Sequence, residues 1–171
     1  GIFIAAWRRL LLQVKNTSRQ SQAITLRGGK GGIHEGGVRV PAVVVWPGVT
    51  KPGSRNETRI QAIDLYPTVL HMLGVESPKT AVIDGVNFIE ALRGAEVERT
   101  PMFTYVPSHG NTPHWLPPSM SVHVGNWKLI RTFYYGEAGT HDYRLYNLQD
   151  DIGESHNLAA AHPEKVQELD G

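Results

Sequence analysis

The pattern of apolar and polar positions changes near the middle of the chain. In the first half, residues 40–46 form an unbroken apolar run that ends at Pro47-Gly48, which is typical of a strand buried on both faces. Residues 59–63 predict a second, shorter strand. A helical pattern follows, so the first half reads as part of an α/β fold.

The first predicted helix covers residues 65–73, where apolar side chains recur at helical spacing. Asp64 is placed to cap its N-terminus, and Gly74 is placed to end it in a left-handed conformation. A second short helix is expected over residues 87–93, just before another glycine.

After Pro101 the apolar residues recur at every second position, which is typical of half-buried strands. Gly125-Asn126 is the signal for a two-residue hairpin turn. The pattern predicts four antiparallel strands and a closing helix that packs Val166 and Leu169 on their sheet, over residues 102–106, 121–124, 127–133, 143–148 and 163–169.

The N-terminal residues 1–25 differ from the rest. An apolar stretch precedes Arg8-Arg9, and no acidic residue occurs before Glu35. A targeting segment, an amphipathic helix and a segment foreign to the following fold all stay open, and the helix is favoured. There is no clear signal peptide, because the secretory order of charge before apolar core is reversed. We expect three parts, at residues 1–25, 26–100 and 101–171.

Composition narrows the function classes. The net charge of +1 argues against a general nucleic-acid binder. The chain has no cysteine, which excludes disulfides, thiolate zinc sites and a cysteine nucleophile within it. No apolar run is long enough for a membrane span.

The candidate chemistry centres on residues 28–37, a stretch rich in glycine with Lys30 among the glycines. A lysine in such a loop can hold sulfate, phosphate or carboxylate against backbone amides. The alternative is a flexible surface loop. His34-Glu35 can be read as an acid–base pair, but a buried Glu35 that pairs with Arg39 is favoured.

Two further histidines, His109 and His114, lie in a proline-rich loop beside an aromatic residue, which suits a sugar or anion site. The alternative is a stiff surface loop with incidental histidines. Asp150-Asp151 could suggest a metal pair, but the polar residues around it favour turn chemistry.

Four segments together resemble the type I sulfatases, the arylsulfatase and N-acetylgalactosamine-6-sulfatase-like members of the alkaline phosphatase superfamily. They are, in order, "LRGGKGGIHEGGVRVPAVVVWPG", "IDLYPTVLHMLGV", "VHVGNWKLI" and "RLYNLQDDIGESHNL". The resemblance implies that residues 26–100 end an α/β sulfatase catalytic domain. Residues 101–171 would then be its C-terminal subdomain, a small antiparallel sheet with a packed helix.

The resemblance also implies a sulfuric ester hydrolase that acts on sulfated carbohydrate or aryl sulfate esters. Such enzymes use a formylglycine nucleophile and a calcium ion, and they are periplasmic, extracellular or lysosomal. Lys30 matches the family's sulfate-binding lysine, so a catalytic and substrate-binding role is expected for it. His109 and His114 are expected to line the substrate pocket of the complete enzyme.

The sequence also departs from the family's pattern. It contains no Cys/Ser-x-Pro-Ser-Arg motif and none of the family's calcium-binding motifs. We therefore expect the C-terminal portion only, inactive alone, with an N-terminal portion as a partner that holds the nucleophile and metal. Residues 40–46 would then expose apolar side chains. A non-catalytic module for anionic sugars, a purely structural fragment, and a phosphatase or phosphonate hydrolase of the same superfamily are the alternatives.

Overall fold

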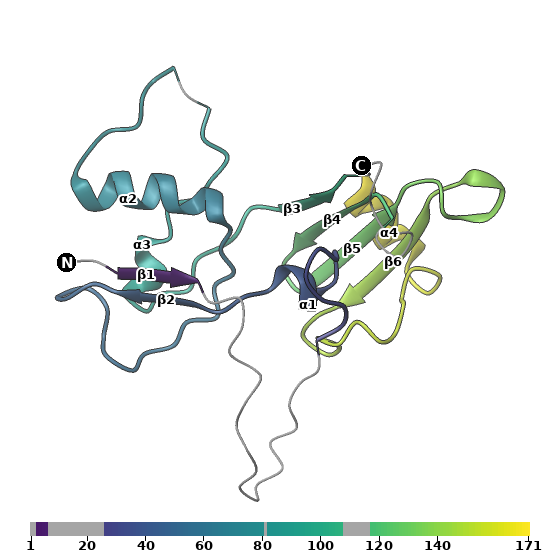
Figure 1. Cartoon of the computed structure of the whole chain (residues 1–171), viewed down its shortest axis with the longest axis horizontal. Helices are drawn as coiled ribbons and strands as arrows, with labels where there is room; N and C mark the ends of the chain where they lie inside the picture. The colour runs from purple at the N-terminus through teal and green to yellow at the C-terminus, as the bar shows by residue number, and fades with distance from the viewer. Residues whose placement is uncertain (1–2, 7–25, 81, 108–116) are drawn as a thin grey trace, which may run out of the picture. The chain divides into compact units, whose positions relative to one another are not determined.

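The computed structural model describes residues 3–6, 26–80, 82–107 and 117–171. Within them the chain forms two compact units: residues 3–6 with 40–100, and residues 26–39 with 101–171 (Figure 1). The glycine-rich stretch therefore belongs with the C-terminal sheet. The predicted parts at residues 1–25, 26–100 and 101–171 stay a prediction. The helix favoured within 1–25 falls mostly outside the described residues, and residues 3–6, which are described, form a strand instead.

In the first unit, β2 (Ala42–Val45) forms the strand predicted from the apolar run and pairs antiparallel with β1 (Phe3–Ala6). The expected burial on both faces is wrong for this chain: Val43 is 56% exposed and Val45 is 48% exposed. The reason is that β2 has a single neighbouring strand among the described residues, so most of its side chains meet no covering layer. The structure agrees with the other expectation, that residues 40–46 expose apolar side chains when only the C-terminal portion is present.

The strand predicted over residues 59–63 is also wrong. That segment runs into a short 3-10 helix, η1 (Ala62–Asp64). The carboxylate of Asp64 accepts hydrogen bonds from the backbone amides of Gln61 (2.6 Å) and Val86 (2.8 Å), and its other partner is the Arg99 guanidinium at 2.9 Å. These bonds hold the chain in a turn, which outweighs the β-propensity of the apolar residues.

The helices of this unit lie close to their predicted places. Helix α2 (Leu65–Leu73) has the predicted bounds and ends at Gly74, whose φ of 65° is left-handed. Asp64 does not cap it through its side chain, because the carboxylate is engaged in η1. Helix α3 (Ile89–Leu92) lies inside the predicted range.

The second unit confirms the predicted antiparallel sheet and closing helix. Its strands hydrogen-bond in sequence order, with Val124 opposite Trp127 across the predicted hairpin turn. After β5 the chain passes through η2 (Glu137–Gly139). The sheet and helix elements are β3 (Met102–Val106), β4 (Ser119–Val124), β5 (Trp127–Thr132), β6 (Asp142–Asn147) and α4 (Pro163–Asp170).

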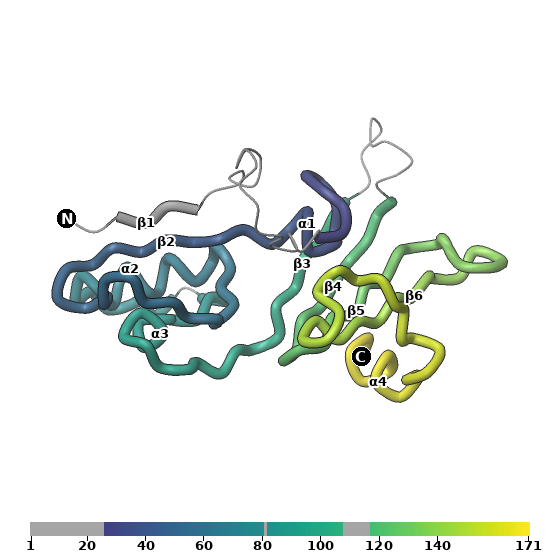
Figure 2. Tube along the Cα trace, turned by 90° about the horizontal axis from the view of Figure 1, so that it is seen from below, coloured from purple at the N-terminus to yellow at the C-terminus, as the bar shows by residue number. Residues whose placement is uncertain are grey.

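Both faces of this sheet are covered. Figure 2 shows the sheet between α4 on one side and the segment around α1 (Glu35–Val38) on the other. Toward α4, the core comprises Val122, Leu129 and Leu145 with the predicted helix residues Val166 and Leu169. On the other face, Ile33 of the glycine-rich segment packs on Ile130, Tyr146 and Leu148. No helix of the described residues is long and apolar enough to cross a membrane.

Candidate functional site

Lys30 lies at the tip of a tight turn. The amide of Gly32 donates a 2.9 Å hydrogen bond to the carbonyl of Gly29, which closes a four-residue turn with Lys30 and Gly31 at its centre. Gly31 has a φ of 91°, a conformation that residues with a Cβ rarely adopt. The Lys30 side chain is exposed, and it makes no hydrogen bond or ion pair with any residue that the structure describes.

Two later glycines let the segment close on itself. The amide of Gly36 donates a 2.8 Å hydrogen bond to the carbonyl of Arg27. A Cβ at Gly36 would lie 2.5 Å from that same oxygen, and a Cβ at Gly37 would lie 2.1 Å from the carbonyl oxygen of Gly32. The glycines are thus required by backbone packing around the Lys30 turn, which argues against the alternative of a freely flexible loop.

Glu35 is the first residue of helix α1, and His34 is its N-cap. Glu35 is 3% exposed, and its carboxylate lies 3.7 Å from the guanidinium of Arg39, which confirms the favoured reading of this pair. The closest partners of Glu35 were not foreseen: Lys128 Nζ lies 2.9 Å and His123 Nε2 lies 3.1 Å from its Oε1.

A second carboxylate, that of Glu154, completes this buried cluster. Lys128 Nζ lies 2.9 Å from Glu154 Oε1, so one ammonium bridges two carboxylates. The amide of Glu35 donates a 2.7 Å hydrogen bond to Glu154 Oε2, and His34 Nδ1 lies 3.3 Å from Oε1. We name these five residues, His34, Glu35, His123, Lys128 and Glu154, the buried charged cluster.

The cluster keeps both carboxylates ionised. Burial raises the pKa of Glu35, but the hydrogen bond with His123 and the charge of Lys128 outweigh it, so the pKa falls to about 2. Burial also raises the pKa of Glu154, but the His34 and Lys128 side chains beside its carboxylate and the hydrogen bond from the Glu35 amide bring it below the usual range. A buried ammonium offsets the desolvation of two carboxylates only in such close geometry.

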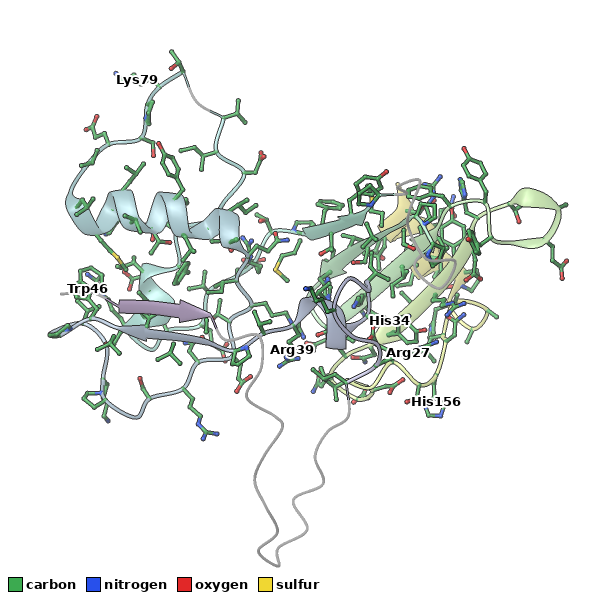
Figure 3. All side chains as sticks on the ribbon, in the orientation of Figure 1. Arg27, His34, Arg39, Trp46, Lys79 and His156 are labelled. Carbon is green, nitrogen blue, oxygen red and sulfur yellow. The ribbon has the colours of Figure 1, made fainter. Side chains whose placement is uncertain are left out.

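Arg27, two residues before the turn, is also bonded to Glu154. Arg27 donates hydrogen bonds from Nη1 to the backbone carbonyl of Glu154 (2.7 Å) and to the hydroxyl of Tyr146 (3.1 Å). Figure 3 labels Arg27 and His34, which both lie beside the sheet of the second unit. The Lys30 turn is therefore fixed on a folded support.

The structure describes only some of the other residues that the sequence singled out. His109 and His114 lie outside the described residues, so their expected role in a substrate pocket stays a prediction. Asp151 accepts hydrogen bonds from the amides of Ser155 (2.7 Å) and His156 (2.8 Å), as expected for turn chemistry.

The described residues do not fit the calcium ion that the resemblance implies. Nowhere among them do three or more histidine, aspartate or glutamate side chains converge as metal ligands. Where Glu35 and Glu154 do converge, the ammonium of Lys128 takes the place that a cation would need. We therefore assign no metal-dependent step to the described part of the chain.

Comparison with known proteins identifies the family. Residues 29–169 match the family described as N-sulphoglucosamine sulphohydrolase, C-terminal. A sulfatase of Formosa agariphila is 33% identical over 151 residues, which cover 85% of this chain and 27% of that protein. The steryl-sulfatase of Rattus norvegicus is 38% identical over 97 residues, which cover 56% of this chain and 17% of that protein.

The fold agrees with these relatives. The crystal structure of Ps i-CgsB superposes with a TM-score of 0.71 at 25% identity, over 84% of this chain and 30% of that one. The chain thus spans less than a third of the length of the relatives it matches. The resemblance drawn from four sequence motifs and the expected alkaline-phosphatase-like α/β fold are confirmed. The chain belongs to the sulfatase family, of which it represents a C-terminal portion.

Proposed function

We propose that this chain forms one wall of the sulfate-binding site of a sulfuric ester hydrolase, with Lys30 as the cation that binds the sulfate. The observation that carries the proposal is the exposed Lys30 ammonium, without a partner among the described residues, on a turn fixed by buried ion pairs. Lys30 also lies inside the region that matches the family.

The proposed chemistry is electrostatic. The Lys30 ammonium would neutralise the negative charge on the sulfate oxygens and on the departing ester oxygen, which lowers the barrier to S–O cleavage. Such stabilisation is strongest when the charged group is already in place before substrate binds, which the fixed turn supports.

A sulfated carbohydrate or aryl sulfate ester is the proposed substrate class. A relative from Formosa agariphila is an ulvan-active sulfatase, and Ps i-CgsB has been solved in complex with k-i-k-neocarrahexaose. These two relatives favour a sulfated carbohydrate as the substrate of the complete enzyme. In the complete enzyme we expect His109 and His114 to contact the substrate, and a separate N-terminal portion to supply the formylglycine and calcium. A periplasmic, extracellular or lysosomal location stays an expectation from the resemblance.

Sulfate binding tests the role of Lys30. Titration of the 171-residue chain with inorganic sulfate, followed by NMR, should shift the amides around Lys30 saturably at low ionic strength. Lys30→Ala should abolish those shifts. Lys51→Ala, which removes an exposed lysine elsewhere, is the matched control and should leave them unchanged. Equal shifts in the wild-type chain and in Lys30→Ala would contradict the proposal.

An activity assay tests whether the nucleophile and the calcium ion are absent from this chain. The chain should not hydrolyse 4-nitrophenyl sulfate with or without added calcium, because it contains no cysteine from which formylglycine could form and no Ser-x-Pro-Ser-Arg motif. Calcium-dependent turnover by the purified chain would show that it carries its own nucleophile, and it would overturn the proposal that a separate N-terminal portion supplies it.

A further inference from the structure

Both ends of the Lys30 turn are tied to one residue, Glu154. Before the turn, Arg27 donates a 2.7 Å hydrogen bond from its guanidinium to the backbone carbonyl of Glu154. After the turn, the amide of Glu35 donates a 2.7 Å hydrogen bond to the Glu154 carboxylate. Directly after Glu35, the amide of Gly36 donates a 2.8 Å hydrogen bond to the carbonyl of Arg27, so the loop is closed at its base.

Glu154 is itself held rigidly. Its side chain has no exposure to solvent, and Lys128 Nζ lies 2.9 Å from its carboxylate. Its backbone has a φ of 52°, and its amide donates a 3.1 Å hydrogen bond to the carbonyl of Asp151. Its carboxylate thus lies between the Lys128 ammonium of the sheet and the Glu35 amide, and its backbone is held in the turn that follows β6.

A glycine-rich loop needs such a support more than other loops do. Glycine loses more conformational freedom on ordering than any other residue, so a free Lys30 turn would lose much of its binding energy to ordering. The bonds to Glu154 are present before any ligand arrives, and they remove that loss.

We infer that Glu154 is a positioning residue for Lys30: it acts through the Lys30 turn and does not touch the sulfate. The inference rests on the proposed function, since it takes Lys30 as the sulfate-binding group. It predicts that a change at a fully buried position, 0% exposed, alters ligand affinity at an exposed lysine.

The test uses two substitutions of Glu154 in the 171-residue chain, with inorganic sulfate as the probe. Glu154→Leu replaces the carboxylate with an apolar side chain and so removes the acceptor, which should weaken sulfate binding by about tenfold or more. It should also speed hydrogen exchange at the Gly36 amide. Glu154→Gln keeps one acceptor oxygen for the Glu35 amide and should retain affinity within about threefold of wild type.

A control separates positioning from general loosening of the fold. Arg131→Met removes a charged side chain from the same sheet, on the α4 face, where it pairs with Asp170 at 3.1 Å. It should change neither sulfate affinity nor exchange at Gly36. If Glu154→Leu does not fold, Arg27→Lys takes its place, because it keeps the positive charge but shortens the side chain that bonds to the Glu154 carbonyl, and it should weaken binding in the same direction.

The possible outcomes distinguish the positioning role of Glu154 from the proposed function of Lys30. Faster exchange at Gly36 with unchanged sulfate affinity would make Glu154 purely structural and overturn the positioning role, while the proposed function would stand. Loss of affinity in Glu154→Gln as large as in Glu154→Leu would also overturn it. If wild type shows no Lys30-dependent binding of sulfate, the proposed function and the positioning role both fail.

Discussion

The backbone amide of Glu35 donates a 2.7 Å hydrogen bond to the carboxylate of Glu154, which lies 119 residues further along the chain. This bond joins two segments that each match a sulfatase motif in the sequence. It places the glycine-rich segment on the C-terminal sheet and gives the exposed Lys30 a rigid base.

Removal of the bridging cation should destabilise the second unit. Lys128→Met leaves two buried carboxylates without their common partner, which costs about 3–5 kcal/mol of unfolding free energy. Urea unfolding followed by the fluorescence of the tryptophans measures it. Lys165→Met, which removes the exposed ion pair with Glu168, should change the free energy by less than about 1 kcal/mol. Equal effects of the two substitutions would contradict a net stabilising role for the cluster.

Acid should weaken the fold through the same cluster. The pKa of Glu35 is about 2 in the folded chain, against 4.5 as its ordinary value. Its stabilising contribution is therefore complete above pH 4.5 and is lost as the pH falls toward 2. Urea unfolding at a series of pH values should show this decline, and Glu35→Gln should make it shallower. The lowered pKa of Glu154 leaves part of the decline in that variant. An identical pH dependence in Glu35→Gln would refute the assignment.

Alanine should open the Lys30 turn at one glycine of the segment and should be tolerated at another. Gly37→Ala places a Cβ 2.1 Å from the Gly32 carbonyl oxygen, so backbone must move and the turn should open. Gly29→Ala meets no atom within 4 Å and should be tolerated. Hydrogen exchange at the Gly32 amide, which is bonded inside the turn, reports both results. Protection that survives in Gly37→Ala would show that the loop is not closed as described.

The core beneath α4 should be sensitive to cavity formation. Leu145 of β6 is fully buried in the cluster that Val166 and Leu169 of α4 cover, and Leu145→Ala should lower the unfolding free energy by about 2–5 kcal/mol. Val43→Ala, on the exposed strand β2, should have an effect of about 0.5 kcal/mol or less. Thermal unfolding by circular dichroism compares them. A larger loss at Val43 than at Leu145 would mean that β2 is covered in solution.

Local sequence determined the regular elements of this protein. The bounds of α2, its end at Gly74 and the hairpin at Gly125-Asn126 depend on residues close together in the chain, so spacing alone predicts them. Alternation likewise indicated the four strands of the C-terminal sheet. The predicted strand over residues 59–63 failed because Asp64 has partners as distant as Val86 and Arg99, which local propensity does not include.

The candidate site was predicted only in part. The sequence singled out Lys30 through its glycine neighbours, and it predicted the burial of Glu35 with Arg39, four residues away. The bridge from Lys128 to Glu154 was not predicted. A lysine inside an apolar strand does indicate a buried charge that needs a partner, but it does not identify that partner. Tertiary structure alone decided this cluster, because desolvated charges select partners by distance in space, and these partners lie far apart in the chain.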